Sequence, residues 1–314
     1  MAKANQKPNT NYGRAKHVAF SIRDMRQKRE FPFNRSDIFP DAIVPEGIDV
    51  GTRKHAQYLF YSCMIDEAAD ANIIYEAMRR LVERFDLENL HKLSRSELKG
   101  VLTQPFERLG DPERAAVNPI DTLYHNSRKL QEEFEGDPRL ILRQGVDKTI
   151  KTIMYGKNRK QKFKRYGEGK SALLMKNFVR FGMWDFSEFE IPIKIDRHAI
   201  RISLGTGVVE IPESMRRGRA GSLTRILRQI YHEVCMNEKI SAIMLNDGMW
   251  ATGRYNCRHN DDIYCRTACR VGCSHRPEIE GSNKKSSGMT SWYLPGTEKR
   301  KNTDNLFRLM SCEE

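Results

Sequence analysis

The chain has 314 residues, of which 39% are hydrophobic and 9% aromatic, and it carries a formal net charge of +13. This length and composition suit one large or two modest globular domains and exclude a disordered chain. No apolar run approaches the ~20 residues of a membrane-spanning helix, and the N-terminal "MAKANQKPNTNYGRAK" lacks a secretory signal. We therefore expect a protein of the cytoplasm, associated with the chromosome, that does not enter a membrane.

Residues 1–45 are predicted to form a basic N-terminal arm, because "FPFNRSDIFP" is too rich in Pro and turn formers for a long helix. A helical domain is predicted over residues 46–250. Its first two helices cover the deeply buried "HAQYLFYSCMI" and a segment from Ile74 to Phe85 with one apolar face. Residues 278–314 are predicted to be a loop-like C-terminal extension.

Several shorter helices are predicted after this pair. Ser94 and Glu97 have the spacing of a capping box, and another helix is predicted to begin at Pro119. The segment "EGDPRLILRQ" indicates a turn followed by a further helix. Because no convincing run of alternating strand residues occurs, the predicted fold class is mostly α.

A block of positive charge lies in the middle of the chain. From Arg143 to Arg180, twelve Lys and Arg residues oppose two acidic residues, a local excess of ten. Such a block suits a phosphate backbone, although a solvated basic surface is the alternative. Near its end, Gly167 and Gly169 predict a tight turn that opens a helix and exposes backbone N–H groups to a phosphate, unless the pair is merely a turn.

Downstream of this turn, "IPIKIDRHAIRIS" places Asp196 at the start of a helix. A plain N-cap aspartate is the simplest interpretation of that position.

Four cysteines gather in the segment 251–277, which is predicted to be a metal-cluster loop. Seven, three and three residues separate Cys257, Cys265, Cys269 and Cys273. Thiolates at this spacing suit tetrahedral zinc or an iron–sulfur cluster. His259 and His275 are alternative ligands. Cys63 and Cys235, by contrast, lie in apolar runs and are predicted to be buried.

Taken in order, the Gly-x-Gly turn, the aspartate, "DGMW" and the four-cysteine loop resemble the helix-hairpin-helix DNA glycosylases related to endonuclease III. The resemblance covers roughly residues 55–275. It implies a two-lobed helical fold with a hairpin near residues 163–172, a [4Fe–4S] cluster on the four cysteines with zinc as the alternative, and a monomer that binds double-stranded DNA. It implies Asp196 as the catalytic aspartate, and it implies DNA contacts by Gly167, Gly169, Lys164, Arg165, Ser171 and His198.

The nucleophilic lysine of that family falls on Lys170 or on Ser171, because the hairpin "RYGEGKSA" is one residue shorter than the family pattern. The resemblance therefore implies a glycosylase that flips and excises a damaged or modified base, with strand cleavage if Lys170 forms a Schiff base. Two alternatives stay open: a non-catalytic metal-cluster DNA-binding protein, and an N-glycosidase acting on nucleosides or RNA. The base pocket is expected around Asp66–Asn72, and the sequence does not specify the base.

Overall fold

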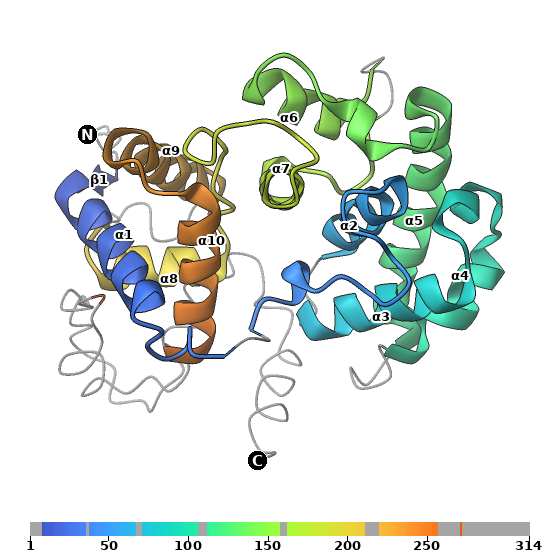
Figure 1. Ribbon diagram of the computed structural model, residues 1–314, viewed down its shortest axis with the longest axis horizontal. Coiled ribbons are helices and arrows are strands. Elements are labelled where there is room, and N and C mark those ends of the chain that lie inside the picture. The colour runs from blue at the N-terminus through green and yellow to red at the C-terminus, as the bar shows by residue number, and fades with distance from the viewer. Residues whose placement is uncertain are drawn as a thin grey trace, which may run out of the picture. The chain divides into compact units, whose positions relative to one another are not determined.

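The computed structural model describes residues 8–35, 38–66, 71–105, 112–157, 162–210, 220–256 and 271. Within these ranges the protein is mostly helical, which confirms the predicted class. Its contacts divide it into two compact units, each built from segments distant in the sequence (Figure 1). Unit 1 takes its described residues from Met1–Asn34, Ile195–Lys239 and Met244–Glu314, and unit 2 from Arg35–Lys194 and Ile240–Ile243.

Helix α2 (Arg53–Ile65) forms the centre of unit 2 and is buried along almost its whole length. It contacts α3 (Ala71–Arg84), α5 (Pro112–Phe134), α7 (Glu168–Arg180) and the short helix η4 (Pro138–Ile141) (Figure 1). The predicted pair of helices is thus confirmed as α2 and α3.

The other helices described in unit 2 are shorter: η1 (Pro40–Ala42), η2 (Leu87–Lys92), α4 (Arg95–Leu102) and α6 (Val146–Tyr155). The predicted capping box is confirmed, because Ser94 accepts from the Glu97 N–H while Glu97 accepts from the Ser94 N–H. The predicted start at Pro119 is wrong, because α5 begins at Pro112 and carries Pro119 inside it. The turn at "EGDP" leads only into the single turn of η4.

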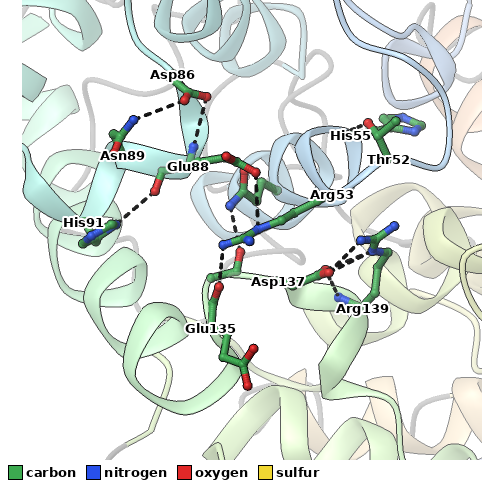
Figure 2. A network of polar contacts seen from close by, with 12 residues as sticks. Thr52, Arg53, His55, Asp86, Glu88, Asn89, His91, Glu135, Asp137 and Arg139 are labelled. Carbon is green, nitrogen blue, oxygen red and sulfur yellow. Dashed lines mark hydrogen bonds and ion pairs between the residues drawn. The ribbon is translucent and has the colours of Figure 1, made fainter.

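A polar network fixes the beginning of α2 against distant parts of unit 2 (Figure 2). Arg53 pairs with Glu88 of η2 and donates to the backbone carbonyl of Glu135. Arg139 forms an ion pair with Asp137 at 2.7 Å and donates to the carbonyl of Gly51. Since these contacts satisfy backbone carbonyls in turns, they hold the central helix in register with its neighbours.

Unit 1 contains a helix that the sequence analysis did not predict. Helix α1 (Tyr12–Gln27) begins at Asn11, whose side chain accepts from the Arg14 N–H, within the segment predicted to be an arm. It buries Ala15, Val18, Ala19, Ile22 and Met25, a one-sided stripe at helical spacing. The other described helices of unit 1 are α8 (Arg197–Gly205), α9 (Ala220–Glu238), α10 (Ala242–Ala251), whose first two residues belong to unit 2, and the wide turn η6 (Thr252–Asn256).

One short antiparallel ladder also belongs to unit 1. Strand β1 (Asn9–Thr10) pairs with β2 (Val209–Glu210), with Asn9 opposite Glu210 and Thr10 opposite Val209. It ties the chain just before α1 to the segment that follows α8.

The close approach of α1 to α10 gives a testable prediction. A Cβ placed on Gly248 would lie 2.0 Å from Cγ2 of Ile22. This methyl is attached to the branched Cβ of Ile22, and it cannot rotate away because χ1 of Ile is restricted in a helix. Gly248→Ala should therefore destabilise unit 1 by about 1–3 kcal/mol, measured by urea unfolding. In an Ile22→Ala background the same change should cost nothing, because the clashing methyl is gone.

Gly100→Ala is the matched control for this change. Gly100 lies inside α4 with open space where its Cβ would be, so alanine should stabilise α4 by up to about 1 kcal/mol. A Gly248→Ala protein as stable as the wild type would show that α1 does not pack on α10 as described.

Candidate active-site elements

Asp196 is the N-cap residue of α8, which confirms its predicted position at the start of a helix. Its Oδ1 accepts from the backbone N–H groups of His198 at 2.8 Å and Ala199 at 3.0 Å. Its Oδ2 forms no hydrogen bond with any described residue. One oxygen thus holds the half-buried carboxylate in one orientation.

His198 follows Asp196 by two residues, and its side chain is buried. Burial lowers the pKa of His198 to about 4, so its imidazole is neutral at physiological pH. The ring packs against the backbone of Gly253 in η6, where an added Cβ would lie 2.5 Å from the Cβ of His198. A buried ring packed against Gly253 suits a structural role, in which His198 supports the start of α8. It suits less well the contact with a DNA phosphate that the resemblance implies.

The predicted Gly-x-Gly turn opens a helix, as expected, with Gly167 as the N-cap of α7. The chain reaches it through Arg165, which has a left-handed backbone with φ of 59°. Tyr166 anchors the turn, since its hydroxyl donates to the Phe60 carbonyl at 2.7 Å and its ring stacks on that of Phe60. Gly167 itself is exposed at the N-terminal end of α7, where backbone N–H groups favour an anion.

Asn126 also holds this turn, and the sequence analysis did not identify it. Its side-chain amide accepts from the Lys164 N–H at 2.8 Å and donates to the Lys164 carbonyl at 2.9 Å. This two-point contact imitates a backbone pairing and fixes the residue that leads into the turn. No sequence signal marked Asn126 in "LYHNSRKL", because its burial and its contact with Lys164, 38 positions away, follow only from the fold.

Lys170 and Ser171, the two candidates for a nucleophile, both make internal contacts. The Lys170 ammonium donates at 2.5 Å to the carbonyl of Met64, in the last turn of α2. The Ser171 hydroxyl is fully buried and donates to the Gly167 carbonyl. Helix C-terminal carbonyls are stabilising partners for cations, so Lys170 fastens α7 to α2.

The basic block divides into structural and surface members. Lys176 is buried and forms an ion pair with Asp41, and Arg180 lies 3.5 Å from the same carboxylate. Lys164 is exposed and pairs with Asp121 at 2.8 Å. The other exposed described cations of the block are Lys148, Lys151, Lys157, Lys162 and Arg165.

The predicted site residues thus fall into two groups. Asp196 and His198 lie in unit 1, whereas Lys164, Arg165, Gly167, Gly169, Lys170 and Ser171 lie together in unit 2.

The four cysteines Cys257, Cys265, Cys269 and Cys273 lie outside the described residues. Within the described ranges, no three His, Cys, Asp or Glu side chains gather as a metal site. Cys63 and Cys235 are buried, as predicted, and burial raises the pKa of each thiol to about 12. Both thiols therefore stay protonated and serve packing.

Comparison with protein-family models, with curated proteins and with solved structures gives no match to the chain. Among the helices that the structure describes, none combines the length and apolar character needed to cross a bilayer.

Proposed function

We propose that the protein is a DNA glycosylase that excises a damaged or modified base, with Asp196 as its catalytic carboxylate. The observation that carries this proposal is the capping geometry of Asp196: two backbone N–H groups of α8 hold Oδ1, and Oδ2 has no hydrogen bond to a described residue. A carboxylate fixed in this way stabilises the positive charge that develops on the sugar as the base departs.

The neutral state of His198 supports this role. A protonated imidazole two residues away would partly cancel the charge of the carboxylate. Because burial lowers the pKa of His198 to about 4, no imidazolium charge opposes the carboxylate near neutral pH.

The turn before α7 is proposed to hold the DNA backbone. Gly167 presents the N-terminal end of α7, and exposed Lys164 and Arg165 lie beside it in the chain. Backbone contacts of this kind compensate the few kcal/mol that extrusion of a base costs.

Water, rather than an amine of the protein, is the proposed nucleophile. Schiff-base formation needs a free neutral amine, whereas Lys170 donates to the Met64 carbonyl and joins α7 to α2. The proposed enzyme therefore removes the base and leaves the strand intact.

The donor set of Cys257, Cys265, Cys269 and Cys273 suits a [4Fe–4S] cluster, with zinc as the alternative. When bound, the metal would cross-link the loop 251–277 and would take no part in the reaction. Cys265→Ser should then remove most of the bound metal, measured as iron and zinc per chain by mass spectrometry. Cys235→Ala, at a buried thiol, is the matched control and should leave the metal content unchanged. Equal metal in both variants would refute a cysteine-held site.

A substrate screen tests the proposed function. Purified protein is incubated with duplex DNA carrying single modified bases, with the same modifications in RNA, and with the free nucleosides, and the released base is quantified. Release from duplex DNA, with strand breaks appearing only after alkali, is the expected result. Release from RNA or nucleosides alone would support an N-glycosidase of another substrate class. If the protein binds DNA but releases no base from any substrate, it is a non-catalytic DNA-binding protein.

A further inference from the structure

A row of aromatic rings in unit 1 leads away from Asp196. It starts at the buried His198, whose ring centroid lies 6.4 Å from that of Trp250. Trp250 lies 6.1 Å from Tyr255, and Tyr255 lies 6.4 Å from Phe31. Successive rings meet edge to face, at 73°, 85° and 74°. We call Trp250, Tyr255 and Phe31 the aromatic row.

The row passes from the interior to the surface. His198 is buried, Trp250 and Tyr255 are half-buried, and Phe31 has 49% of its surface exposed. Phe31 is the one aromatic side chain among the exposed large hydrophobic residues of the described chain. Packing of the core accounts for the buried end of the row, and the exposed Phe31 ring brings its other end within reach of a ligand in solution.

Positive charge accompanies the rings. The Arg254 guanidinium lies 5.4 Å from the Trp250 ring centroid and 5.8 Å from that of Tyr255. Arg26, Lys28 and Arg29 are exposed just before Phe31 in the chain. Arg26 lies 4.0 Å from the buried Asp247. From Arg23 to Glu30 the chain carries four cations against Asp24 and Glu30, so this segment keeps a net positive charge.

Rings interleaved with cations match the chemistry of an unpaired nucleic-acid strand. Each base offers an apolar π-face for stacking, and each linkage carries a phosphate for an arginine or lysine. A fully paired duplex keeps its base faces stacked inside and offers only phosphates. An apolar peptide would gain little from the cations. An anionic lipid surface would attract them but could take up only the exposed Phe31 end of the row, because Trp250 and Tyr255 are half-buried.

We propose that the aromatic row stacks on the unpaired bases of a nucleic-acid strand, with Arg254 and the basic segment before Phe31 contacting its phosphates. This proposal deepens the proposed function. It rests on that function for one point only: that the strand bound by the row continues towards Asp196, next to which His198 lies. Stacking itself is measurable without catalysis.

Trp250 serves as the reporter of binding. The chain has three tryptophans, so Trp184→Phe with Trp292→Phe leaves Trp250 alone. A thymidine single strand of about ten nucleotides should quench its fluorescence on titration. The same strand in a perfect duplex, and inorganic polyphosphate, should bind more weakly and quench less. Equal quenching by polyphosphate would show that the ligand binds through its charge and not by stacking of bases on the rings, and it would overturn the proposal.

Phe31→Ala and Tyr255→Ala should each weaken binding of the single strand about 5- to 100-fold without changing its salt dependence. Arg254→Gln should lower the slope of log affinity against log salt by about 1. Leu140→Ala in unit 2 is the matched control, since Leu140 is 47% exposed and not aromatic. Circular dichroism verifies the fold of each variant. Unchanged affinity in the folded Phe31→Ala protein would contradict the proposal.

The two proposals fail in different ways. If Phe31→Ala weakens strand binding but the wild type releases no base, the aromatic row stands and the glycosylase proposal falls. If bases are released and Phe31→Ala binds the strand as the wild type does, the glycosylase stands and the row falls.

Discussion

Asp196→Asn is expected to slow base excision about 100- to 1000-fold, because it removes the charge that stabilises the transition state. The amide oxygen of Asn can still accept from the His198 and Ala199 N–H groups, and Asn is as good an N-cap as Asp. The free energy of unfolding should therefore change by less than about 1 kcal/mol. Single-turnover kinetics and urea unfolding measure the two quantities.

Asp86→Asn is the matched control for this substitution. Asp86 also caps a helix, accepting from the Glu88 N–H at the start of η2 (Figure 2). It lies in unit 2 and is exposed. It should leave the excision rate unchanged. An Asp196→Asn enzyme as fast as the Asp86→Asn enzyme would mean that Asp196 is only a cap.

Asp41→Asn should destabilise unit 2 by about 3–5 kcal/mol, the largest effect on stability expected here. Asp41 is buried, accepts from the Lys176 ammonium and lies 3.5 Å from Arg180. Loss of the carboxylate charge removes the buried counter-charge that these two largely buried cations share. Lys176→Met in the same protein should recover part of the loss, because one of these cations is then gone.

The same carboxylate makes stability depend on pH. Desolvation opposes ionisation of Asp41, but the charges of Lys176 and Arg180 outweigh it and hold its pKa at about 2, below the ordinary 3.8. Its contribution is complete above pH 3.8 and is lost as the pH falls towards 2. Wild-type stability should therefore fall across this window more steeply than that of Asp41→Asn.

Fluorescence of Trp184, which is 2% exposed in unit 2, reports this unfolding once Trp250 and Trp292 are replaced by Phe. Asp121→Asn is the control, because Asp121 also pairs with Lys164 and Arg95 but is 40% exposed. Its loss should cost less than about 1 kcal/mol. If Asp41→Asn and Asp121→Asn lower the free energy of unfolding equally, the buried ion pairs of Asp41 stabilise the protein no more than surface pairs do.

Local sequence signals predicted local structure well. The capping box at Ser94, the helix that opens after Gly167 and the helix that begins after Asp196 each depend on residues within three or four positions. Helix α1 was missed because its buried stripe is built mainly of small residues between many charged ones, a weak hydrophobic pattern.

Contacts between distant segments could not be predicted. Asp41 and Lys176 are 135 positions apart, and Asn126 and Lys164 are 38 apart. Neither pair has a periodic or spacing signal, because only the packing of α7 and α5 around α2 brings them together. The aromatic row likewise joins Phe31 to Tyr255 through the fold alone.

The most direct test of the account is detection of the free base. Duplexes with single modified bases are incubated with wild-type and Asp196→Asn protein, and the low-molecular-weight fraction is analysed by mass spectrometry. We expect one released base class with the wild type and almost none with Asp196→Asn. Equal release by the two proteins, or binding of DNA without any release by the wild type, would contradict it.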